Sequence, residues 1–329
     1  MATQTTPERT VHIVSHGPHC LDGVAAAIAV TRFHEGVRVI PQFAVNPEID
    51  QVLRNVRPAE PHGYELWITD ISWREKITDD HLRSLAEAGV RIYWFDHHRT
   101  ALKRHGEGAI NVPFADFVVS EKVAASRLVY EYLERRLAGE AGNRPAFRDL
   151  ARLIEMADDN DRWLHRVPGS RELALVVRAL GPESYQELLN LGADLSYTPR
   201  MVAAHLRIKE ELERTFELAQ ATRTSWQLPD GTTLIAAVCN GYASEVADRW
   251  GKETSRAVFA LYDSRSLAVS LRRSPDCKVD LSRVAERLGG GGHAAAAGCE
   301  LTEARTALAR AVGDAVAVAI RKEDARPKR

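Results

Sequence analysis

The sequence predicts an α/β protein with an N-terminal parallel-sheet domain, a helical linker and a smaller C-terminal α/β domain. Short apolar segments alternate with helical patterns in the N-terminal half, which is typical of strand–helix–strand units and a parallel sheet. A charged helical segment at 199–223 then precedes a second group of strands. The length of 329 residues also exceeds the usual domain size of roughly 100–200 residues. We therefore place the domains at 1–195 and 227–329, with the linker at 196–226.

The first domain contains short apolar strands separated by helices. Strands are predicted at 11–15, 66–68 and 91–95, and helices at 23–33, 78–88, 123–137 and 147–156. Each strand is followed by acidic or histidine residues. Because the carboxyl ends of parallel strands share one edge of the sheet, where ligands bind in such folds, these polar residues are expected to lie together.

The second domain begins after Leu228 as a strand-rich region. Strands are predicted at 233–239, 257–262 and 266–272, and helices at 281–288 and 304–320. Between the two helices lies GGGGHAAAAG, at 289–298. We expect this segment to be a glycine loop that runs into a further, alanine-rich helix.

Composition and charge narrow the function classes. The net charge is −1, whereas proteins that bind long nucleic acids usually carry a basic stripe, so a small nucleotide or phosphate-chain substrate fits better. No signal-peptide pattern or long apolar stretch occurs, so neither secretion nor a membrane is expected. Four cysteines without a CxxC pair indicate free thiols and a cytoplasmic location. The sequence leaves open whether the chain is a monomer or a homodimer.

Acidic and histidine residues at the predicted strand ends are candidate metal ligands. They are His16 and Asp22 after the first strand, Asp70 after the second, Asp96, His97 and His98 after the third, and Asp161 in the acidic segment 157–163. Carboxylates combined with imidazoles suit Mn²⁺ or another borderline divalent ion. A single aspartate at a strand end is more often a turn or capping residue, but the shared edge favours a metal site for the group. Two ions that share one carboxylate would activate water and neutralise phosphoryl charge.

The glycine-rich segment and a nearby arginine pair are candidate phosphate-binding elements. Consecutive glycines let backbone N–H groups approach an anion, a following helix start would add a positive dipole end, and His293 could donate a hydrogen bond. Arg272 and Arg273 end a predicted strand, and arginine offers a bidentate fork to phosphate. The alternatives are a flexible turn into a packed helix for the glycines and simple solvation for the arginines.

Five segments carry distinctive motifs. They are HGPHCLDG, LWITDIS, WFDHH, DNDRW, and VSLRRS followed by GGGGHAAAAG. In this order and over nearly the whole chain, the motifs resemble those of the DHH phosphoesterase superfamily with its C-terminal DHH-associated domain. Members of that superfamily include single-strand exonucleases, nano-RNA and cyclic-dinucleotide phosphodiesterases, exopolyphosphatases and a related pyrophosphatase group.

The resemblance implies roles for the motif residues and two divalent ions, with Mn²⁺ as the expected metal. His16 and Asp70 would hold one ion, while Asp22, Asp70, His97 and Asp161 would hold the other. His98 would touch the reacting phosphate, and Asp96 would orient the neighbouring ligands. Arg272 together with Gly290, Gly291, Gly292 and His293 would bind the distal phosphate of the substrate. The cleft between the domains would then be the active site.

Two places depart from the family pattern or leave it ambiguous. Members commonly carry an aspartate two residues before the one that matches Asp22, and here that residue is Cys20. Cys20 could bind metal as a thiolate, leave the first ion weakly held, or only pack, and we favour a weak or absent ligand because carboxylates dominate the set. Asp158, Asp159 and Asp161 lie close together, and we favour Asp161 because it directly precedes an Arg-Trp pair, with Asp159 as the alternative.

These features predict a metal-dependent phosphodiesterase that hydrolyses short oligonucleotides or linear or cyclic dinucleotides with metal-activated water. Exopolyphosphatase is the alternative activity. A nucleotide-binding module whose chemistry is weakened by the change at Cys20 is the alternative from a different class. We do not expect a processive exonuclease, because the chain shows only the two core domains and no basic excess.

Overall fold

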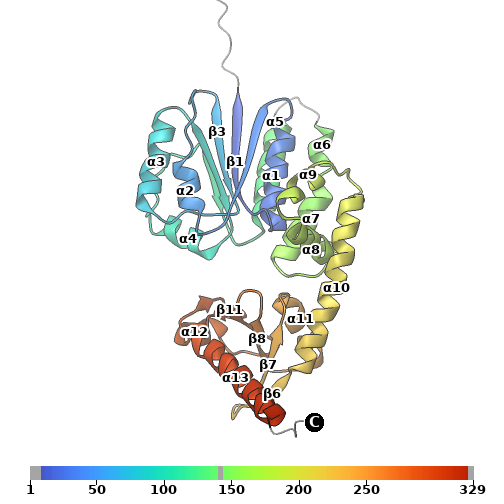
Figure 1. Ribbon diagram of the computed structural model, residues 1–329. Coiled ribbons are helices and arrows are strands. Elements are labelled where there is room, and N and C mark those ends of the chain that lie inside the picture. The colour runs from blue at the N-terminus through green and yellow to red at the C-terminus, as the bar shows by residue number, and fades with distance from the viewer. Residues whose placement is uncertain (1–8, 140–143, 325–329) are drawn as a thin grey trace, which may run out of the picture. The chain divides into compact units, whose positions relative to one another are not determined.

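The computed structural model describes residues 9–139 and 144–324. The chain divides into two compact units, residues 1–208 and 209–329. The division falls inside helix α10 (Pro199–Ala221), which the sequence predicts as the charged linker helix (Figure 1). Each unit has its own sheet and hydrophobic core, so the two are described separately.

The first unit is built on five parallel strands in the order β2-β1-β3-β4-β5 (Figure 1). Their bounds are β1 Thr10–His16, β2 Arg38–Ala44, β3 Tyr64–Thr69, β4 Arg91–Asp96 and β5 Asp116–Val119. The predicted parallel sheet is confirmed, and the predicted strands are its three central ones. The two strands that the sequence does not reveal are the edges. Strand β2 is partly exposed and contains Pro41, and β5 has only 4 residues, so neither shows the continuous apolar run of a buried strand.

Helices cover both faces of this sheet (Figure 1). Their bounds are α1 Leu21–Phe33, α2 Ile49–Arg54, α3 Lys76–Glu87, α4 Arg99–Gly106, α5 Ala125–Gly139, α6 Pro145–Arg148, α7 Ala151–Asp161, α8 Ser170–Leu180 and α9 Ser184–Leu189, with the short 3-10 helix η1 Gly181–Glu183. Side chains alternate between the faces: Ile68 and Trp94 pack with α2 and α3, whereas the Phe95 ring packs at a tilt against Tyr132 of α5. The predicted helix at 147–156 is two helices, and the acidic segment belongs to the end of α7.

The strand order changes direction at β1, and this sets where a ligand can bind. Helix α1 connects β1 to β2 on one side, and β3 pairs with the opposite side of β1. In open parallel sheets the crevice at such a switch point lies beyond the carboxyl ends of the strands. His16 ends β1 and Asp70 directly follows β3, so these two residues flank the crevice.

Glu65 of β3 is a buried charge with several partners. Its carboxylate accepts hydrogen bonds from Arg9, Arg91 and the Trp67 indole N–H, and His34 Nε2 lies 3.3 Å away. Burial alone would raise the pKa of Glu65, but the neighbouring histidine, arginine and tryptophan groups outweigh it and hold the pKa well below its usual range. The network therefore stabilises the ionised form of the carboxyl group.

We expect Glu65→Ala to lower the free energy of unfolding of this unit by about 3 kcal/mol, because hydrogen bonds to charged groups contribute about 1.5–3 kcal/mol and buried His34 loses its partner. Since the folded-state pKa is depressed, this stabilisation is present above the ordinary glutamate value of 4.5 and is lost as pH falls below it. Urea unfolding followed by tryptophan fluorescence, near neutral pH and at about pH 3, measures both effects. Glu107→Ala is the control, because its exposed pair with Lys103 spans 3.9 Å and should contribute at most about 1 kcal/mol. An equal loss at both pH values would contradict this account.

The second unit is built on a mixed six-stranded sheet in the order β10-β11-β9-β8-β7-β6. The strands are β6 Thr224–Gln227, β7 Thr233–Cys239, β8 Ala257–Asp263, β9 Ala268–Arg273, β10 Gly291–Gly292 and β11 Ala296–Cys299, and the helices are α11 Ala243–Glu253, α12 Leu281–Arg287 and α13 Thr302–Asp324. The three predicted strands correspond to β7, β8 and β9. Strand β6 begins within the segment 196–226 that we predicted as helical linker, because α10 ends at Ala221 and the chain turns at once to pair antiparallel with β7.

The alanine run after the glycines forms a bend and then enters strand β11 at Ala296, so the prediction of a helix there is wrong. Strand β11 pairs antiparallel with β9, with Ala296 opposite Arg272, and β10 pairs with its other side. Alanine favours a helix in the absence of tertiary contacts. Here β9 offers backbone hydrogen-bond partners for a strand, and Gly298 disfavours a helix. The helix N-terminus expected directly after His293 is therefore absent from this described segment.

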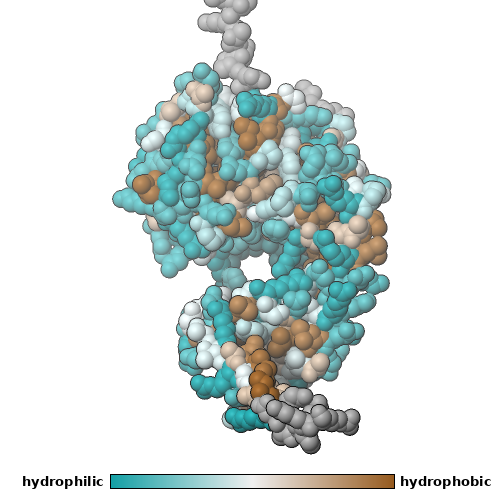
Figure 2. Space-filling view, in the orientation of Figure 1, coloured by the Kyte–Doolittle hydropathy of each residue, from teal (hydrophilic) through white to brown (hydrophobic). Residues whose placement is uncertain are grey.

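The surface of the first unit is mainly hydrophilic on the face that Figure 2 shows, with small apolar patches between the hydrophilic residues. Among the residues that the structure describes, no helix combines the length and the apolar character needed to cross a membrane. The two longest helices, α10 and α13, both carry charged residues at intervals along their length.

Candidate metal centre

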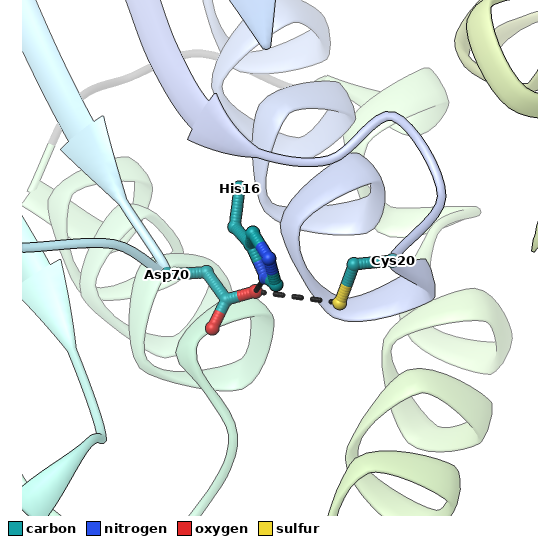
Figure 3. A group of neighbouring side chains, drawn as sticks. All are labelled: His16, Cys20 and Asp70. Carbon is teal, nitrogen blue, oxygen red and sulfur yellow. Dashed lines mark hydrogen bonds and ion pairs between the residues drawn. The ribbon is translucent and has the colours of Figure 1, made fainter. Parts of the chain in front are cut away.

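A backbone hydrogen bond joins Asp70, the residue after β3, to the end of β4. This residue has a left-handed backbone (φ 58°), and its N–H donates to the Phe95 carbonyl oxygen near the end of β4 (2.9 Å). A positive φ is uncommon outside glycine but is tolerated by aspartate and asparagine, and such residues gather at functional sites. The Asp70 side chain lies beside those of His16 and Cys20, as Figure 3 shows.

Helix α1 approaches the end of β1 so closely that only glycine fits at one position. A Cβ atom at Gly23 would lie 2.0 Å from the His16 carbonyl oxygen. The Ser15 hydroxyl donates to the Gly23 carbonyl oxygen (2.7 Å) and accepts from Thr69 Oγ1 (2.8 Å), which joins β1, α1 and β3. Glycine at position 23 is thus a packing requirement that lets the first turn of α1 approach the carboxyl edge of the sheet.

The two carboxylate oxygens of Asp70 face two different groups of donors. Oδ2 lies 3.3 Å from His16 Nδ1 and 3.5 Å from Cys20 Sγ (Figure 3). Oδ1 lies 3.3 Å from His97 Nε2 and 4.0 Å from His98 Nδ1. Asp70 is buried and common to both groups. This is the arrangement that a carboxylate needs in order to bridge two cations.

Asp22, His97 and Asp161 form a further group beside Asp70 Oδ1. His97 Nε2 lies 3.8 Å from Asp22 Oδ2 and 3.4 Å from Asp161 Oδ2. The donor atoms of these three residues lie within 4.8 Å of one another, close enough to share one ion. Asp22 also accepts the backbone N–H groups of Ala125 and Ser126 (2.9 Å each), so the same carboxylate fixes the start of α5.

Only one of the three clustered aspartates of α7 joins this group. Asp158 accepts the Ala124 backbone N–H (2.8 Å), and Asp159 accepts the Ser170 hydroxyl (2.5 Å). A helix turns about 100° per residue, so Asp159 and Asp161 point in nearly opposite directions. The structure therefore brings Asp161 to the site and gives the alternative, Asp159, a role in packing.

Asp96 is buried and holds the ring of His98. Its Oδ1 accepts the His98 backbone N–H (2.9 Å) and lies 2.7 Å from His98 Nδ1, while the Ser72 hydroxyl donates to Oδ2. The contact with Asp96 raises the pKa of His98 against the effect of burial. Because Nδ1 is engaged by Asp96, Nε2 is the ring nitrogen that can contact a substrate.

The site concentrates negative charge that its histidines only partly offset. Burial and the Asp70 and Asp161 carboxylates raise the pKa of Asp22 well above its usual range, and burial raises the pKa of Asp161 to about 6. Burial would lower the pKa of His97, but the surrounding carboxylates raise it to about 10. Burial would also raise the pKa of Asp70, yet His16 and His97 hold it well below its usual range. A bound cation would relieve this accumulation of charge.

Two buried atoms at the centre of the site lack hydrogen-bond partners, which also fits a cation. They are Asp70 Oδ1 and His97 Nε2, which lie 3.3 Å apart in an orientation that forms no hydrogen bond. A buried polar atom without a partner costs about 1–3 kcal/mol. Coordination of a divalent ion would satisfy both atoms, and imidazole and carboxylate are suitable ligands for one.

In the second unit, Arg272 lies beside the turn that carries His293. Arg272 is opposite Ala296 in the β9–β11 ladder, and the His293 N–H donates to the Ala296 carbonyl oxygen (2.7 Å). The Arg272 guanidinium donates to Ser244 Oγ (3.1 Å), so part of its hydrogen-bonding capacity is used within the unit. The neighbouring Arg273 donates to the Val279 carbonyl oxygen (2.8 Å), which gives it a structural partner.

Packing explains two of the three predicted phosphate-binding glycines. A Cβ atom at Gly290 would lie 2.1 Å from the Gly298 carbonyl oxygen, and one at Gly292 would lie 2.5 Å from Ala297 Cα. The hairpin of β10 and β11 therefore requires glycine at both positions. A Cβ atom at Gly291 would meet nothing within 4 Å, so the backbone there faces open space.

Trp163 is a candidate functional residue to which the sequence analysis assigned no role of its own. It lies two positions after Asp161, has a φ of 55°, and is 43% exposed. The Arg171 guanidinium lies 5.1 Å over its ring, and the ring of His165 meets it edge-on at 4.6 Å. A large aromatic side chain that remains exposed, two residues along the chain from a candidate metal ligand, is suited to contact a ligand. The sequence signal for it is the tryptophan of DNDRW.

Comparisons with known proteins agree with this architecture. Residues 231–321 match the DHHA1 domain family. The chain is 26% identical over 310 residues to oligoribonuclease NrnB of Bacillus subtilis strain 168, a match that covers 89% of this chain and 73% of that protein.

Two solved structures share the fold at low sequence identity. The pGpG-specific phosphodiesterase PggH from Vibrio cholerae aligns with a TM-score of 0.56 and 13% identity, over 92% of this chain and 97% of that one. RecJ from Thermus thermophilus, in complex with Mn²⁺, aligns with a TM-score of 0.55 and 18% identity, over 94% of this chain and 52% of that one.

The family match and the motifs concern different parts of the chain. The DHHA1 match lies in the second unit, whereas the His and Asp motifs lie at the carboxyl edge of the parallel sheet in the first unit. The alignment with NrnB and the shared folds extend over both parts. The second unit therefore matches the DHHA1 domain family, and over both units the chain is similar in sequence and fold to proteins of the DHH phosphoesterase type.

Proposed function

We propose that this protein is a divalent-metal-dependent phosphodiesterase that hydrolyses short oligonucleotides or dinucleotides. The observation that carries the proposal is the buried Asp70 carboxylate, whose two oxygens face two groups of metal donors. The names of two relatives, an oligoribonuclease and a pGpG-specific phosphodiesterase, support a substrate of this class. Divalent ions, of which Mn²⁺ suits this donor set, would activate water and offset the negative charge of the phosphoryl group.

Each donor group has a role in this proposal. His16 and Asp70 would hold one ion, and Asp22, Asp70, His97 and Asp161 would hold the other. Asp96 keeps the His98 ring in place through Nδ1, so that Nε2 can donate a hydrogen bond to an oxygen of the reacting phosphate. These side chains come from three strand ends and two helices, which fixes their positions before substrate binds.

We assign the binding of a second phosphate group of the substrate to the DHHA1 domain. Arg272 and His293 are the side chains, and they lie at the same end of the β9–β11 pair. The segment Gly290 to Gly292 would add backbone N–H groups, with the open space over Gly291 as the point of approach.

Trp163 favours a nucleotide over a polyphosphate substrate, because an exposed indole ring can stack on a base. We expect Trp163→Ala to raise KM for the dinucleotide pApA about tenfold or more, since stacking of one base contributes about 1–3 kcal/mol. The inhibition constant of tripolyphosphate, which has no base, should stay unchanged. Trp163→Phe keeps an aromatic ring and should retain most of the affinity. Equal weakening of both ligands would show that Trp163 only positions the chain.

A substrate panel tests the proposed function as a whole. Turnover of pApA, pGpG, cyclic dinucleotides, 3′-phosphoadenosine phosphate and polyphosphate is measured with Mn²⁺ and after its removal by a chelator. We expect metal-dependent hydrolysis of the linear dinucleotides. Hydrolysis of polyphosphate alone would make the protein an exopolyphosphatase. Binding of nucleotides without turnover of any substrate would make it a binding module.

A further inference from the structure

Cys20 differs in its surroundings from the other cysteines. Cys239, Cys277 and Cys299 are buried in apolar clusters of the second unit. Cys20 is the N-cap residue directly before α1, it is partly exposed, and its Sγ lies 3.5 Å from Oδ2 of the buried Asp70. A cysteine that only packs is surrounded by apolar atoms, as the other three are. Cys20 instead lies beside a carboxylate, where its sulfur can act as a metal ligand.

Three donors of different chemistry converge at this point. A ring nitrogen of His16, Cys20 Sγ and a carboxylate oxygen of Asp70 lie within 4.8 Å of one another (Figure 3). His16 ends β1, Cys20 caps the start of α1 and Asp70 follows β3, so three separate backbone elements hold the donors in place. An imidazole, a thiol and a carboxylate at these separations are a ligand set for one transition-metal ion.

The neighbouring group contains no sulfur. Its donors are the carboxylates of Asp22 and Asp161 and the imidazole of His97, next to the second oxygen of Asp70. Thiolates favour softer ions such as Zn²⁺, whereas carboxylates favour Mn²⁺ and Mg²⁺. The two metal positions therefore differ in the softness of their ligands, although they share the carboxylate of Asp70.

We propose that Cys20 is a metal ligand and that the protein holds a mixed-metal centre. The position of His16, Cys20 and Asp70 selects Zn²⁺, Co²⁺ or Fe²⁺, and the position of Asp22, His97 and Asp161 selects Mn²⁺. This inference rests on the metal centre of the proposed function, and it reverses the preference for a weak or absent ligand that the sequence alone favours.

Binding at the first position is a simple exchange. The S–H bond of Cys20 breaks, its proton passes to solvent, and a sulfur–metal bond forms, so no oxidant or reductant is needed. The thiolate and the Asp70 carboxylate then together offset the charge of one divalent ion. The thiol lies next to that carboxylate before the metal arrives, so binding requires little movement.

Absorption spectroscopy of the Co²⁺-loaded full-length protein tests the proposal. Co²⁺ bound to a thiolate gives an intense sulfur-to-metal charge-transfer band in the near ultraviolet, whereas nitrogen and oxygen ligands give only the weaker visible d–d bands. We expect the near-ultraviolet band in the wild type and its loss in both Cys20→Ser and Cys20→Ala, with d–d bands retained from the other position. Cys277→Ala is the matched control, because this cysteine is buried in the second unit, and it should keep the band.

The possible spectra separate this inference from the proposed function. Visible bands without the near-ultraviolet band in the wild type would overturn ligation by Cys20 and leave the metal centre standing. A near-ultraviolet band that persists in Cys20→Ser would belong to another cysteine and would also overturn it. A protein that binds no Co²⁺ at all would remove the metal centre, and with it both proposals.

Metal content after equilibration with equal concentrations of Zn²⁺ and Mn²⁺ gives a second readout, measured by mass spectrometry. We expect the wild type to hold both metals in similar amounts. Cys20→Asp should shift the ratio toward Mn²⁺ by about tenfold or more, because the change replaces a soft ligand by a hard one. An unchanged ratio would overturn the selectivity assigned to Cys20.

Discussion

Replacing Asp70 by asparagine is expected to abolish phosphodiesterase turnover while leaving the fold intact. The substitution removes the one carboxylate that faces both donor groups, with His16 on one side and His97 on the other. Loss of a residue that only supports a metal ligand already lowers affinity or activity by about 10–100-fold. Loss of the shared ligand should therefore lower kcat/KM on the order of 1000-fold, with a parallel loss of bound metal.

Asparagine is the suitable replacement because it keeps the shape of the side chain and tolerates the left-handed backbone at this position (φ 58°). Circular dichroism and urea unfolding should match those of the wild type. Asp80→Asn, the same change at an exposed residue of α3, should leave turnover unaffected. Activity near the wild-type level in Asp70→Asn would sink the assignment of Asp70 as the shared ligand.

A pair of substitutions on α7 is expected to separate metal binding from stability. Asp161→Asn should lower metal content and turnover by about 100-fold or more, because its carboxylate lies 3.4 Å from His97 Nε2. Asp159→Asn should keep the metal and most of the activity, because that carboxylate accepts hydrogen bonds from Ser170 and Arg166. Its cost should be about 1–2 kcal/mol of stability from the weaker hydrogen bonds.

The two variants control each other, since both carry the same chemical change on the same helix. Mass spectrometry of bound metal and urea unfolding are measured for each. Metal loss in Asp159→Asn with metal retained in Asp161→Asn would mean that α7 presents its other face to the ions.

The central strands and the residues after them could be predicted from the sequence, because both can be recognised from residues that are neighbours in the chain. Strands β1, β3 and β4 are buried on both faces and consist mainly of apolar residues. Parallel pairing places the residues that follow such strands on one edge of the sheet. For this reason the sequence alone predicts that His16, Asp70 and His97 come together, which the structure shows.

Elements at the margins of the two sheets depend on their neighbours instead. Strands β2 and β5 lie at sheet edges and contain polar residues or proline, so their segments do not resemble strands in isolation. Strand β11 begins with two alanines, which favour helix in isolation, and it forms a strand here because β9 offers it hydrogen-bond partners. Local propensity is weak compared with the free energy of such pairing, so these parts are decided by contacts distant in sequence.

The set of candidate ligands follows from the sequence, whereas the use of each one depends on the tertiary structure. Asp159 and Asp161 are alike in chemistry and close in sequence, and only the packing of α7, in which Ser170 donates to Asp159, turns Asp161 toward His97. The thiol of Cys20 likewise meets Asp70, a residue 50 positions away, only because α1 packs against the end of β1. Side-chain direction follows from which face of an element is buried, and burial depends on elements that are far apart in the chain.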